Sequence, residues 1–380
     1  MDASSKLSLS GERFHVGYRL HAREAEAQAM AQHICLEQTV EFPVDLVPAG
    51  DIRDNIVGHI EDFRRINDDS YVATISFAIE TTGFELPQLL NVVFGNISIM
   101  PGIRVDQLEL PPALLRAFAG PRFGRTGLRE RLGVATRPLL CTALKPMGLS
   151  VAELADQSYR FALGGIDIIK DDHGLANQGF APYHERVQAC VAAVERANHE
   201  TGQRCLYMPN VTAPADLMLE RALFAQQAGA GGLLIAPGLV GLDMMRQVAD
   251  DDRINVPILS HPAWQGSLVT NPNSGISHYA LFGQLARLAG ADGSIYPNYG
   301  GRFAFSREDC VSICAGTAVA MAHIKPIFPA PGGGMSLARV PEMIELYGRD
   351  IIFLVGGGLH THGPDLVQNS RYFYQLVAAL

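Results

Sequence analysis

Short apolar segments alternate with longer amphipathic segments over residues 137–380. Eight of the short segments have the length and β-branched content of strands, and each is followed by a segment with helical spacing. Strands that are apolar on both faces are typical of a parallel sheet covered by helices. The predicted strands lie within residues 137–146, 166–172, 205–210, 231–237, 256–262, 292–298, 323–330 and 350–358.

This alternation predicts a (β/α)8 barrel, because eight strand–helix units over about 240 residues match the size and rhythm of that fold. A doubly wound sheet is the alternative, but it usually has fewer strands and an early G-x-G-x-x-G turn, which this chain lacks. We predict that the barrel spans residues 126–380. In such a barrel the chemistry lies at the carboxyl ends of the strands, in the loops that lead to the helices.

Residues 1–125 have a different pattern, which predicts a separate α+β domain. Residues 14–22 alternate like a strand, and residues 23–35 have helical spacing. Prolines and glycines over residues 108–127 predict a linker to the barrel. Further strand-like apolar runs lie at residues 39–47, 55–63, 71–79 and 89–100.

Composition narrows the class of protein. The 380 residues are 48% hydrophobic, which excludes global disorder, and the net charge of −9 excludes the general basic footprint of a nucleic-acid-binding protein. Six scattered cysteines, and the absence of an apolar stretch in the first 14 residues, favour a cytoplasmic protein. The longest uncharged stretch, residues 86–103, is interrupted by prolines, so we expect a buried strand there and no membrane span.

The end of the second barrel strand combines a lysine, two carboxylates and an imidazole, from Lys170 to His173. Neighbouring strand residues point to opposite faces, so Lys170 and Asp172 share one face and Asp171 points away. A lysine in an apolar strand must be paired or modified, which leaves two interpretations. If the lysine is converted into an oxygen ligand, the group forms a metal site; otherwise the group is a structural ion pair.

Other strand ends hold further candidate groups. Lys145 follows the first barrel strand, where it could neutralise an enolate or move a proton. Asn210 could bind a substrate by hydrogen bonds, and His261 could move protons near neutral pH. His360 and His362 alternate after the last strand, which favours a loop. Glycine triplets follow strands seven and eight, at the usual phosphate position of this fold, and predict backbone N–H groups that hold a phosphate. They are Gly332, Gly333, Gly334, Gly356, Gly357 and Gly358.

Nine segments spread along the chain match one known family. They are ICLEQTVEFP, VVFGNIS, LELPPALLRAFAGPRFG, RPLLCTALKPMGLS, GGIDIIKDDHGLANQ, HPAWQGS, YPNYGGRFAF, PAPGGGMSLARVPEMIELYGRD and FLVGGGLHTHG. With them the chain resembles the large subunit of ribulose-bisphosphate carboxylase over essentially its whole length. The resemblance implies a ferredoxin-like N-terminal domain on the barrel. It also implies a homodimer in which Glu37 and Asn96 of one subunit reach into the barrel mouth of its partner.

The resemblance further implies roles for single residues. Lys145 matches the family's proton-transfer lysine, and His261 matches its strand-five histidine. Lys170 matches the lysine that CO2 converts into a carbamate, and Asp172 matches a carboxylate that binds the divalent metal. The glycine triplets match the site of one phosphate, and the family's loop-six lysine aligns most simply with Arg302.

Several substitutions argue against CO2 fixation. His173 replaces the family's second acidic metal ligand; we still expect Mg²⁺, with Mn²⁺ or Zn²⁺ as alternatives because imidazole suits them better. Pro262 replaces the arginine that holds a second phosphate, and Met147 replaces a lysine after strand one. Arg302 is no equal substitute for a lysine point charge. We therefore expect a RuBisCO-like protein, of the non-carboxylating branch, with a singly phosphorylated substrate.

The expected activity is metal-assisted enolate chemistry on a sugar phosphate or sugar-acid phosphate. Members of this branch isomerise or enolise sulfur-bearing sugar phosphates in methionine salvage, and others decarboxylate or hydrolyse 3-oxo sugar-acid phosphates. The altered metal ligand and loop six favour the second type, with a substrate like 3-oxo-isoapionate 4-phosphate. The alternatives are an isomerase or enolase of a methylthio sugar phosphate, a metal-independent isomerase that uses Lys145 or His261, and a non-catalytic binding protein.

Overall fold

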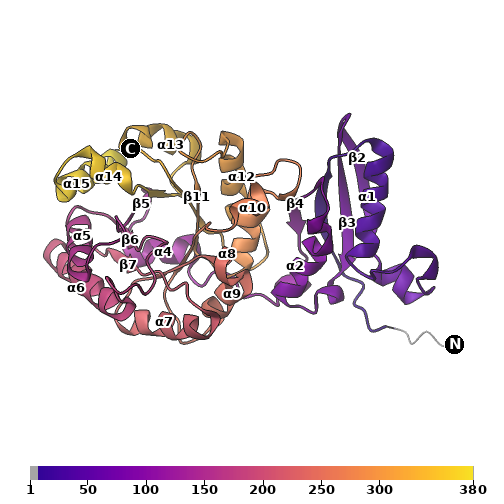
Figure 1. Cartoon of the computed structure of the whole chain (residues 1–380), viewed down its shortest axis with the longest axis horizontal. Helices are drawn as coiled ribbons and strands as arrows, with labels where there is room; N and C mark the ends of the chain where they lie inside the picture. Colours follow the sequence, from indigo (N-terminus) through magenta and orange to yellow (C-terminus); the bar gives the residue numbers. More distant parts are fainter. Residues whose placement is uncertain (1–6, 380) are drawn as a thin grey trace.

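Two parts of the molecule lie side by side, an antiparallel sheet with its helices and a barrel (Figure 1). The computed structural model describes residues 7–379. Residues 1–6, which are part of the N-terminal segment without an apolar stretch, lie outside the described residues. The N-terminal part contains β1 (Arg13–Leu20), α1 (Glu24–Glu37), η1 (Val44–Leu46), η2 (Ile52–Ile56), β2 (His59–Asn67), β3 (Ser70–Ala78), η3 (Ile79–Thr82), α2 (Leu86–Phe94), η4 (Asn96–Ile99) and β4 (Ile103–Glu109).

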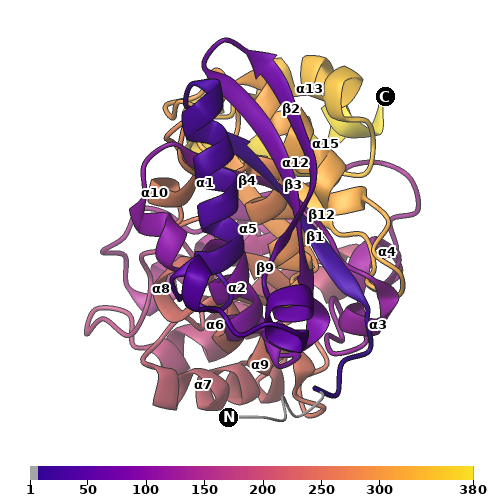
Figure 2. The ribbon, with the colours of Figure 1, turned by 90° about the vertical axis from the view of Figure 1, so that its right-hand side faces the viewer.

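The sheet of this part has the order β4–β1–β3–β2, and all these neighbours are antiparallel. With one helix after β1 and one after β3, this is the predicted ferredoxin-like arrangement. Helix α1 packs on β2 and β3 (Figure 2). The alternate residues Phe14, Val16 and Tyr18 of β1 are fully buried in the core. A short strand from the barrel part, β10 (Gly275–Ile276), pairs in parallel with β4 and extends the same sheet.

Residues 89–100 form no strand, so the prediction for this apolar run is wrong. Residues 89–94 belong to α2, and residues 96–99 form η4. Leu86, Leu89 and Val93 are buried along one face of α2, and Pro87 lies in its first turn, where proline is tolerated. A short apolar run fits a buried helix as well as a buried strand, so its pattern does not separate the two.

Residues 39–47 are also wrongly predicted as a strand. They form a loop that contains the short turn η1. Pro43 within this loop lacks the N–H that a sheet ladder requires. Of residues 55–63, only those from His59 onward join a strand, because η2 precedes them.

The predicted linker, residues 108–127, is ordered secondary structure for much of its length. It contains the end of β4, the helix α3 (Pro112–Leu115) and the beginning of α4 (Gly124–Leu132). Pro112 stands in the first turn of α3, where proline starts a helix instead of breaking it. The division of the chain between residues 125 and 126 stays a prediction.

All eight predicted barrel strands are present. Their parallel neighbours form two four-stranded sheets, β13–β5–β6–β7 and β8–β9–β11–β12. A bridge between Asn210 and Leu234 joins the sheets on one side, and β12 contacts β13 on the other, which closes the (β/α)8 barrel. The strands are β5 (Leu139–Ala143), β6 (Ile168–Lys170), β7 (Leu206–Met208), β8 (Leu233–Ile235), β9 (Ile258–Ser260), β11 (Gly293–Pro297), β12 (Phe328–Gly332) and β13 (Ile352–Leu354).

Helices surround the barrel, and side chains fill its interior. Leu139, Ile168 and Leu234 belong to an interior cluster that helix α4 covers with Leu128. Among residues 7–379, no helix has the length and apolar content needed to cross a membrane. The remaining helical segments are α5 (Val151–Leu163), α6 (Tyr183–Thr201), α7 (Ala215–Gln227), α8 (Pro237–Val240), α9 (Leu242–Asp250), α10 (Gly266–Val269), η5 (Tyr279–Leu285), α11 (Ala286–Leu288), α12 (Arg307–Ala318), η6 (Leu337–Arg339), α13 (Val340–Tyr347), α14 (Gly357–His362) and α15 (Leu366–Ala378).

Candidate active site

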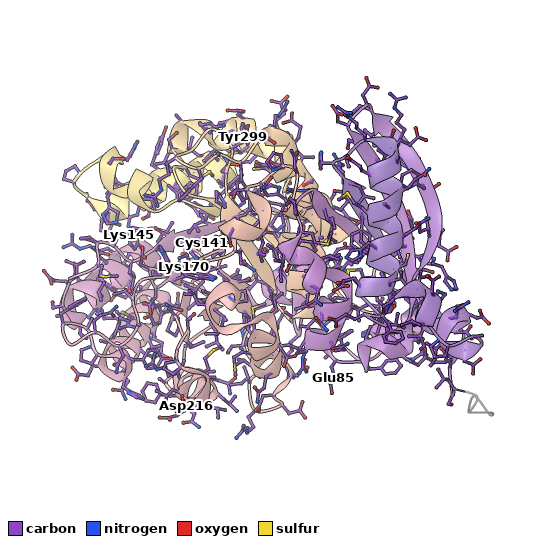
Figure 3. All side chains as sticks on the ribbon, turned by 45° about the vertical axis from the view of Figure 1, so that its right-hand side comes forward. Glu85, Cys141, Lys145, Lys170, Asp216 and Tyr299 are labelled. Atoms are coloured by element: carbon purple, nitrogen blue, oxygen red, sulfur yellow. The ribbon has the colours of Figure 1, made fainter. Side chains whose placement is uncertain are left out.

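The predicted catalytic residues lie at the carboxyl edge of the barrel strands. Lys170 is the last residue of β6, and Lys145 lies two residues beyond the end of β5, the strand beside it. His261 directly follows β9. Figure 3 shows Lys145 and Lys170 close together, with Cys141 of β5 beside them. The register of β5 and β6 therefore brings both lysines to one end of the barrel.

Lys170 is almost fully buried, with 2% of its surface exposed. Its Nζ donates a hydrogen bond to the carbonyl oxygen of Asp171 at 3.1 Å. The pKa of Lys170 is lowered to about 8, mainly by burial and also by the neighbouring Lys145, against the opposing effects of Cys141 and Asp171. A lowered pKa increases the fraction of neutral amine near neutral pH, and the neutral amine is the form that reacts with CO2.

The two carboxylates after Lys170 face different partners, as the strand geometry predicts. Asp171 accepts hydrogen bonds from Arg186 at 3.2 Å and from the hydroxyl of Tyr207 at 2.7 Å, and all three side chains are buried. Asp172 instead contacts Nζ of Lys145, and its Oδ1 lies 3.0 Å from Nδ1 of His173. Asp171 is thus part of a structural ion pair, while Asp172 belongs to the candidate site.

His173 and His261 stack on each other, with ring centroids 4.5 Å apart and planes within 11°. Burial lowers the pKa of His261 to about 2, assisted by the nearby Lys170, His173 and Lys145. Nδ1 of His261 accepts a hydrogen bond from the backbone N–H of Ala263 at 3.2 Å. A neutral ring that accepts at Nδ1 has its proton on Nε2, so His261 can donate a hydrogen bond at that atom.

The site contains more positive than negative charge. Burial lowers the pKa of Lys145, and Arg302 of loop six, residues 298–306, is close enough to lower it further. His173 also has a lowered pKa, because of burial and then because of Lys170, Lys145 and Arg302. Asp172 contacts Lys145 and offsets part of this charge, while Asp171 is paired with Arg186. Such a cluster favours an anionic ligand.

The glycine triplets adjoin this cluster. A Cβ added at Gly356 would lie 3.6 Å from Cε of Lys145. A Cβ at Gly358 would lie 2.5 Å from the carbonyl oxygen of Met335, so the loops after β12 and β13 touch. A Cβ at Gly301 would lie 2.3 Å from the carbonyl oxygen of Gly333, so loop six packs on the loop after β12, backbone against backbone. Gly332 ends β12, Gly334 lies in the loop after it, and Gly357 begins α14.

Two amide side chains hold the candidate groups, and the sequence pattern does not single out either for this role. Gln157 of α5 donates from Nε2 to the carbonyl oxygen of Lys145 at 2.6 Å. Asn210 donates from Nδ2 to the carbonyl oxygens of His173 and Leu175, at 3.0 and 2.9 Å. Asn210 therefore positions the loop that contains His173, and a contact of Asn210 with substrate stays a prediction.

Glu37 and Asn96, predicted to serve a partner subunit, lie together in the N-terminal part. Nδ2 of Asn96 donates to Oε1 of Glu37 at 3.0 Å, and this contact is exposed. His360 and His362 lie in α14 and not in a loop, which corrects the expectation for this pair. Helix α14 begins at Gly357, within the second glycine triplet, and Gly356 is its N-cap.

The donor set fits a divalent metal once Lys170 is modified. Two ligands bound at about 2.1 Å and at right angles lie about 3 Å apart, which matches Oδ1 of Asp172 and Nδ1 of His173 at 3.0 Å. Among residues 7–379, no group of three histidine, cysteine, aspartate or glutamate side chains could hold a metal ion. Lys170 would supply a third oxygen donor if it carried a carbamate.

A family sequence model described as the catalytic domain of the ribulose bisphosphate carboxylase large chain matches residues 124–301. Two bacterial relatives are each 38% identical over 97% of this chain. One is ribulose bisphosphate carboxylase-like protein 1 of Rhodopseudomonas palustris, and the match spans 98% of the length of that protein. The other is 5-methylthioribulose-1-phosphate isomerase of Rhodospirillum rubrum, and the match spans 96% of the length of that protein. The 2,3-diketo-5-methylthiopentyl-1-phosphate enolase of Geobacillus thermodenitrificans is 34% identical over 81% of this chain and 75% of its own length.

Solved structures have the same fold. A RuBisCO-like protein from Rhodopseudomonas palustris is 36% identical and superposes with a TM-score of 0.87, over 96% of this chain and 97% of its own. A dimeric archaeal RuBisCO from Hyperthermus butylicus is 27% identical, with a TM-score of 0.87 over 98% of this chain and 91% of its own. The names of the relatives favour the isomerase or enolase alternative over the leading expectation of a 3-oxo acid phosphate. The chain belongs to the ribulose bisphosphate carboxylase large-chain family, as an enzyme of its RuBisCO-like branch.

Proposed function

We propose that this chain isomerises a singly phosphorylated methylthio sugar of the 5-methylthioribulose 1-phosphate type, by proton transfer next to a carbonyl. The observation that carries the proposal is the pair of cationic side chains Lys145 and Arg302 beside the two glycine triplets. The full-length relative from Rhodospirillum rubrum that bears this name supports it.

The anionic end of the substrate binds at the glycine loops. Backbone N–H groups of the loops after β12 and β13 approach a phosphate without hindrance, because glycine has no side chain. Arg302 adjoins these loops through the contact of Gly301 with Gly333, and it supplies positive charge. One phosphate fits here. Pro262 stands where the carboxylases hold the second, so the other end of the substrate is free of phosphate.

The proton is moved by Lys145, which lies next to Gly356 and contacts Asp172. A base at this position takes a proton from the hydroxyl-bearing carbon beside the carbonyl and returns it to the former carbonyl carbon. The hydroxyl proton of the first carbon passes to the former carbonyl oxygen, so the carbonyl changes place and the composition of the sugar is unchanged. Neutral His261 donates from Nε2 to the oxygen on which negative charge develops. Lys170 as carbamate, Asp172 and His173 would hold a divalent metal ion, which polarises the substrate carbonyl when bound.

Proton NMR in heavy water tests this proposal. The protein is incubated with Mg²⁺, bicarbonate and 5-methylthioribulose 1-phosphate, and 3-oxo-isoapionate 4-phosphate serves as the comparison substrate. We expect deuterium at the carbon beside the carbonyl and a rearranged sugar of otherwise unchanged mass. Loss of CO2 from the comparison substrate, without exchange in the methylthio sugar, would overturn the proposal in favour of carbon–carbon cleavage.

A second candidate is enolisation of 2,3-diketo-5-methylthiopentyl 1-phosphate, which the relative from Geobacillus thermodenitrificans favours by its name. It requires the same phosphate site, base and metal, and it differs in that the second carbonyl is already present in the substrate. The same NMR experiment with this diketone separates the two, because turnover of the diketone alone assigns the enolase.

The imidazole of His173 should shift the metal preference away from Mg²⁺. Nitrogen ligands suit Mn²⁺ and Zn²⁺, so we expect both ions to bind more tightly than Mg²⁺ in calorimetric titrations with bicarbonate. His173→Glu should restore an all-oxygen set and reduce the ratio of Mn²⁺ to Mg²⁺ affinity by about tenfold. His199→Glu, at an exposed histidine of α6, is the matched control and should leave the ratio unchanged. An unchanged ratio in His173→Glu would exclude His173 from the ligand set.

We also propose a homodimer that shares its two sites, with Glu37 and Asn96 placed over the barrel mouth of the partner. The exposed apolar side chains Phe42, Val44 and Ile99 in the same part of the chain suit an interface. Mixing equal amounts of inactive Glu37→Gln and Lys170→Ala proteins under exchange should restore about a quarter of the wild-type activity, since half the dimers are hybrids with one intact site. Each variant alone is the control. An inactive mixture, with subunit exchange shown by native mass spectrometry, would argue against shared sites.

A further inference from the structure

The loop after β9 contains a strained turn at the barrel mouth. The backbone N–H of Gln265 donates to the carbonyl oxygen of Pro262 at 3.0 Å, which closes a four-residue turn. Trp264, the third residue of this turn, has a φ of +70°. That position with positive φ favours glycine, and a bulky aromatic residue there is an outlier. Strain of this kind persists only where the surrounding structure fixes it, and it is concentrated at functional sites.

The surroundings do fix this turn. The N–H of Ala263 donates to Nδ1 of His261, which ties the turn to the catalytic group. On its other side the turn packs against α8, since a Cβ added at Gly238 would lie 2.4 Å from the carbonyl oxygen of Ala263. Gln265 is buried, and its Oε1 has no hydrogen-bond partner among the described residues. The turn thus has a strained backbone and an unpaired buried acceptor, next to His261.

In this strained turn the large apolar side chain of Trp264 is exposed to solvent and not buried. The side chain of Trp264 is 78% exposed, although it follows His261 by only three residues. Met147, in the loop after β5, is 52% exposed at the same end of the barrel. Pro262 stands in this turn where the carboxylases hold a second phosphate by an arginine, and residues 262–265 contain no cation. The chemistry of these exposed groups suits an uncharged, polarisable group such as a thioether, which packs well on an indole ring.

We propose that Trp264 is a specificity-determining residue that contacts the methylthio end of the substrate, opposite the phosphate. This inference rests on the proposed function, because it assigns the substrate end that the glycine loops do not hold. The backbone strain at Trp264 holds the indole exposed, in a turn that is hydrogen-bonded to His261 through Ala263. An alkylthio group would displace water from the face of the indole.

The chain contains a single tryptophan, so its fluorescence reports on this residue alone. The probes are two polyols that cannot react, 5-methylthioribitol 1-phosphate and ribitol 1-phosphate. We expect the methylthio probe to shift the emission to shorter wavelength and to bind about tenfold more tightly than ribitol 1-phosphate, as one additional apolar group in a pocket typically does. Equal affinities and an unchanged emission with both probes would overturn the inference.

Two variants separate recognition from structural support. Trp264→Gly should raise KM for the methylthio sugar about tenfold, while kcat falls by no more than about twofold. Its melting temperature should be unchanged or higher, since glycine adopts positive φ without strain. Trp264→Phe should recover most of the affinity. A lower melting temperature with unchanged KM, or dissociation of the dimer in sedimentation, would assign Trp264 to the fold or the interface instead.

The outcomes also separate this inference from the proposed function. If the wild-type protein turns over no methylthio sugar but still prefers the methylthio probe, the proposed reaction fails and the apolar subsite stands. If the wild-type protein isomerises the sugar and Trp264→Gly retains its KM, the reaction stands and the subsite fails.

Discussion

Lys170→Ala should lower kcat for the methylthio sugar by at least about a thousandfold, equivalent to about 4 kcal/mol of transition-state stabilisation. In the proposed function Lys170, as a carbamate, supplies the third oxygen donor beside Asp172 and His173. Among the described residues, no group of three histidine, cysteine, aspartate or glutamate side chains could hold a metal ion. Without that donor, two ligands remain, and the metal that polarises the carbonyl is not retained.

The measurement combines steady-state kinetics with Mn²⁺ titrations followed by electron paramagnetic resonance. Bicarbonate should strengthen Mn²⁺ binding in the wild-type protein and have no effect in Lys170→Ala. Lys170→Met fills the buried space better and should behave in the same way. Lys325→Ala, at an exposed lysine, is the matched control and should retain activity and binding. Mn²⁺ binding that does not depend on bicarbonate in any of these proteins would contradict the carbamate.

Arg186→Met should lower the free energy of unfolding by about 3–5 kcal/mol, because it leaves the carboxylate of Asp171 buried without a counter-charge. Arg186 and Asp171 are both fully buried, and Arg186 also donates to the carbonyl oxygens of Ala181 and Ala176 at 2.6 and 2.8 Å. These bonds fix the loop after β6 on α6, and the loss of all of them adds to the cost.

Urea denaturation followed by circular dichroism measures this effect. The double variant Asp171→Asn/Arg186→Met should recover part of the loss, since it removes the unpaired charge. Arg196→Met, at an exposed arginine of the same helix, is the control and should change stability by less than about 1 kcal/mol. A loss below about 1 kcal/mol in Arg186→Met would show that the pair contributes little to the fold.

The barrel could be predicted from the sequence because each strand is a short apolar run bounded by turn residues. Residues 166–172 illustrate this, since the run ends in Lys170 and three polar residues that mark the carboxyl end of β6. The N-terminal part was harder to predict, because the same residue type occurs there in two kinds of structure. Apolar residues fill a buried helix such as α2 as well as a strand, and proline begins α3 as readily as it ends other helices.

The candidate site shows a similar division. Lys145, Lys170, Asp172 and His261 could be predicted because they occupy strand ends, and strand ends meet in a barrel. The residues that hold them could not be predicted from the pattern. Gln157 reaches the site from the middle of α5. The sequence does not show whether an amide side chain is solvated or hydrogen-bonded to a backbone group far away in the chain. The orientation of Trp264 is equally invisible in the sequence, because it depends on one backbone torsion.

The pairing of β10 with β4 has a consequence for how the chain is made. Gly275 pairs with Arg104, about 170 residues earlier in the chain. At about 5–20 residues per second, a ribosome needs roughly 10–30 s to synthesise that interval. During that time the outer edge of β4 has no neighbour and is open to pairing with other nascent chains. Arg104 and Asp106 of β4 are charged residues of the kind that discourage such pairing. They therefore protect the exposed edge of β4 against aggregation until β10 has been synthesised.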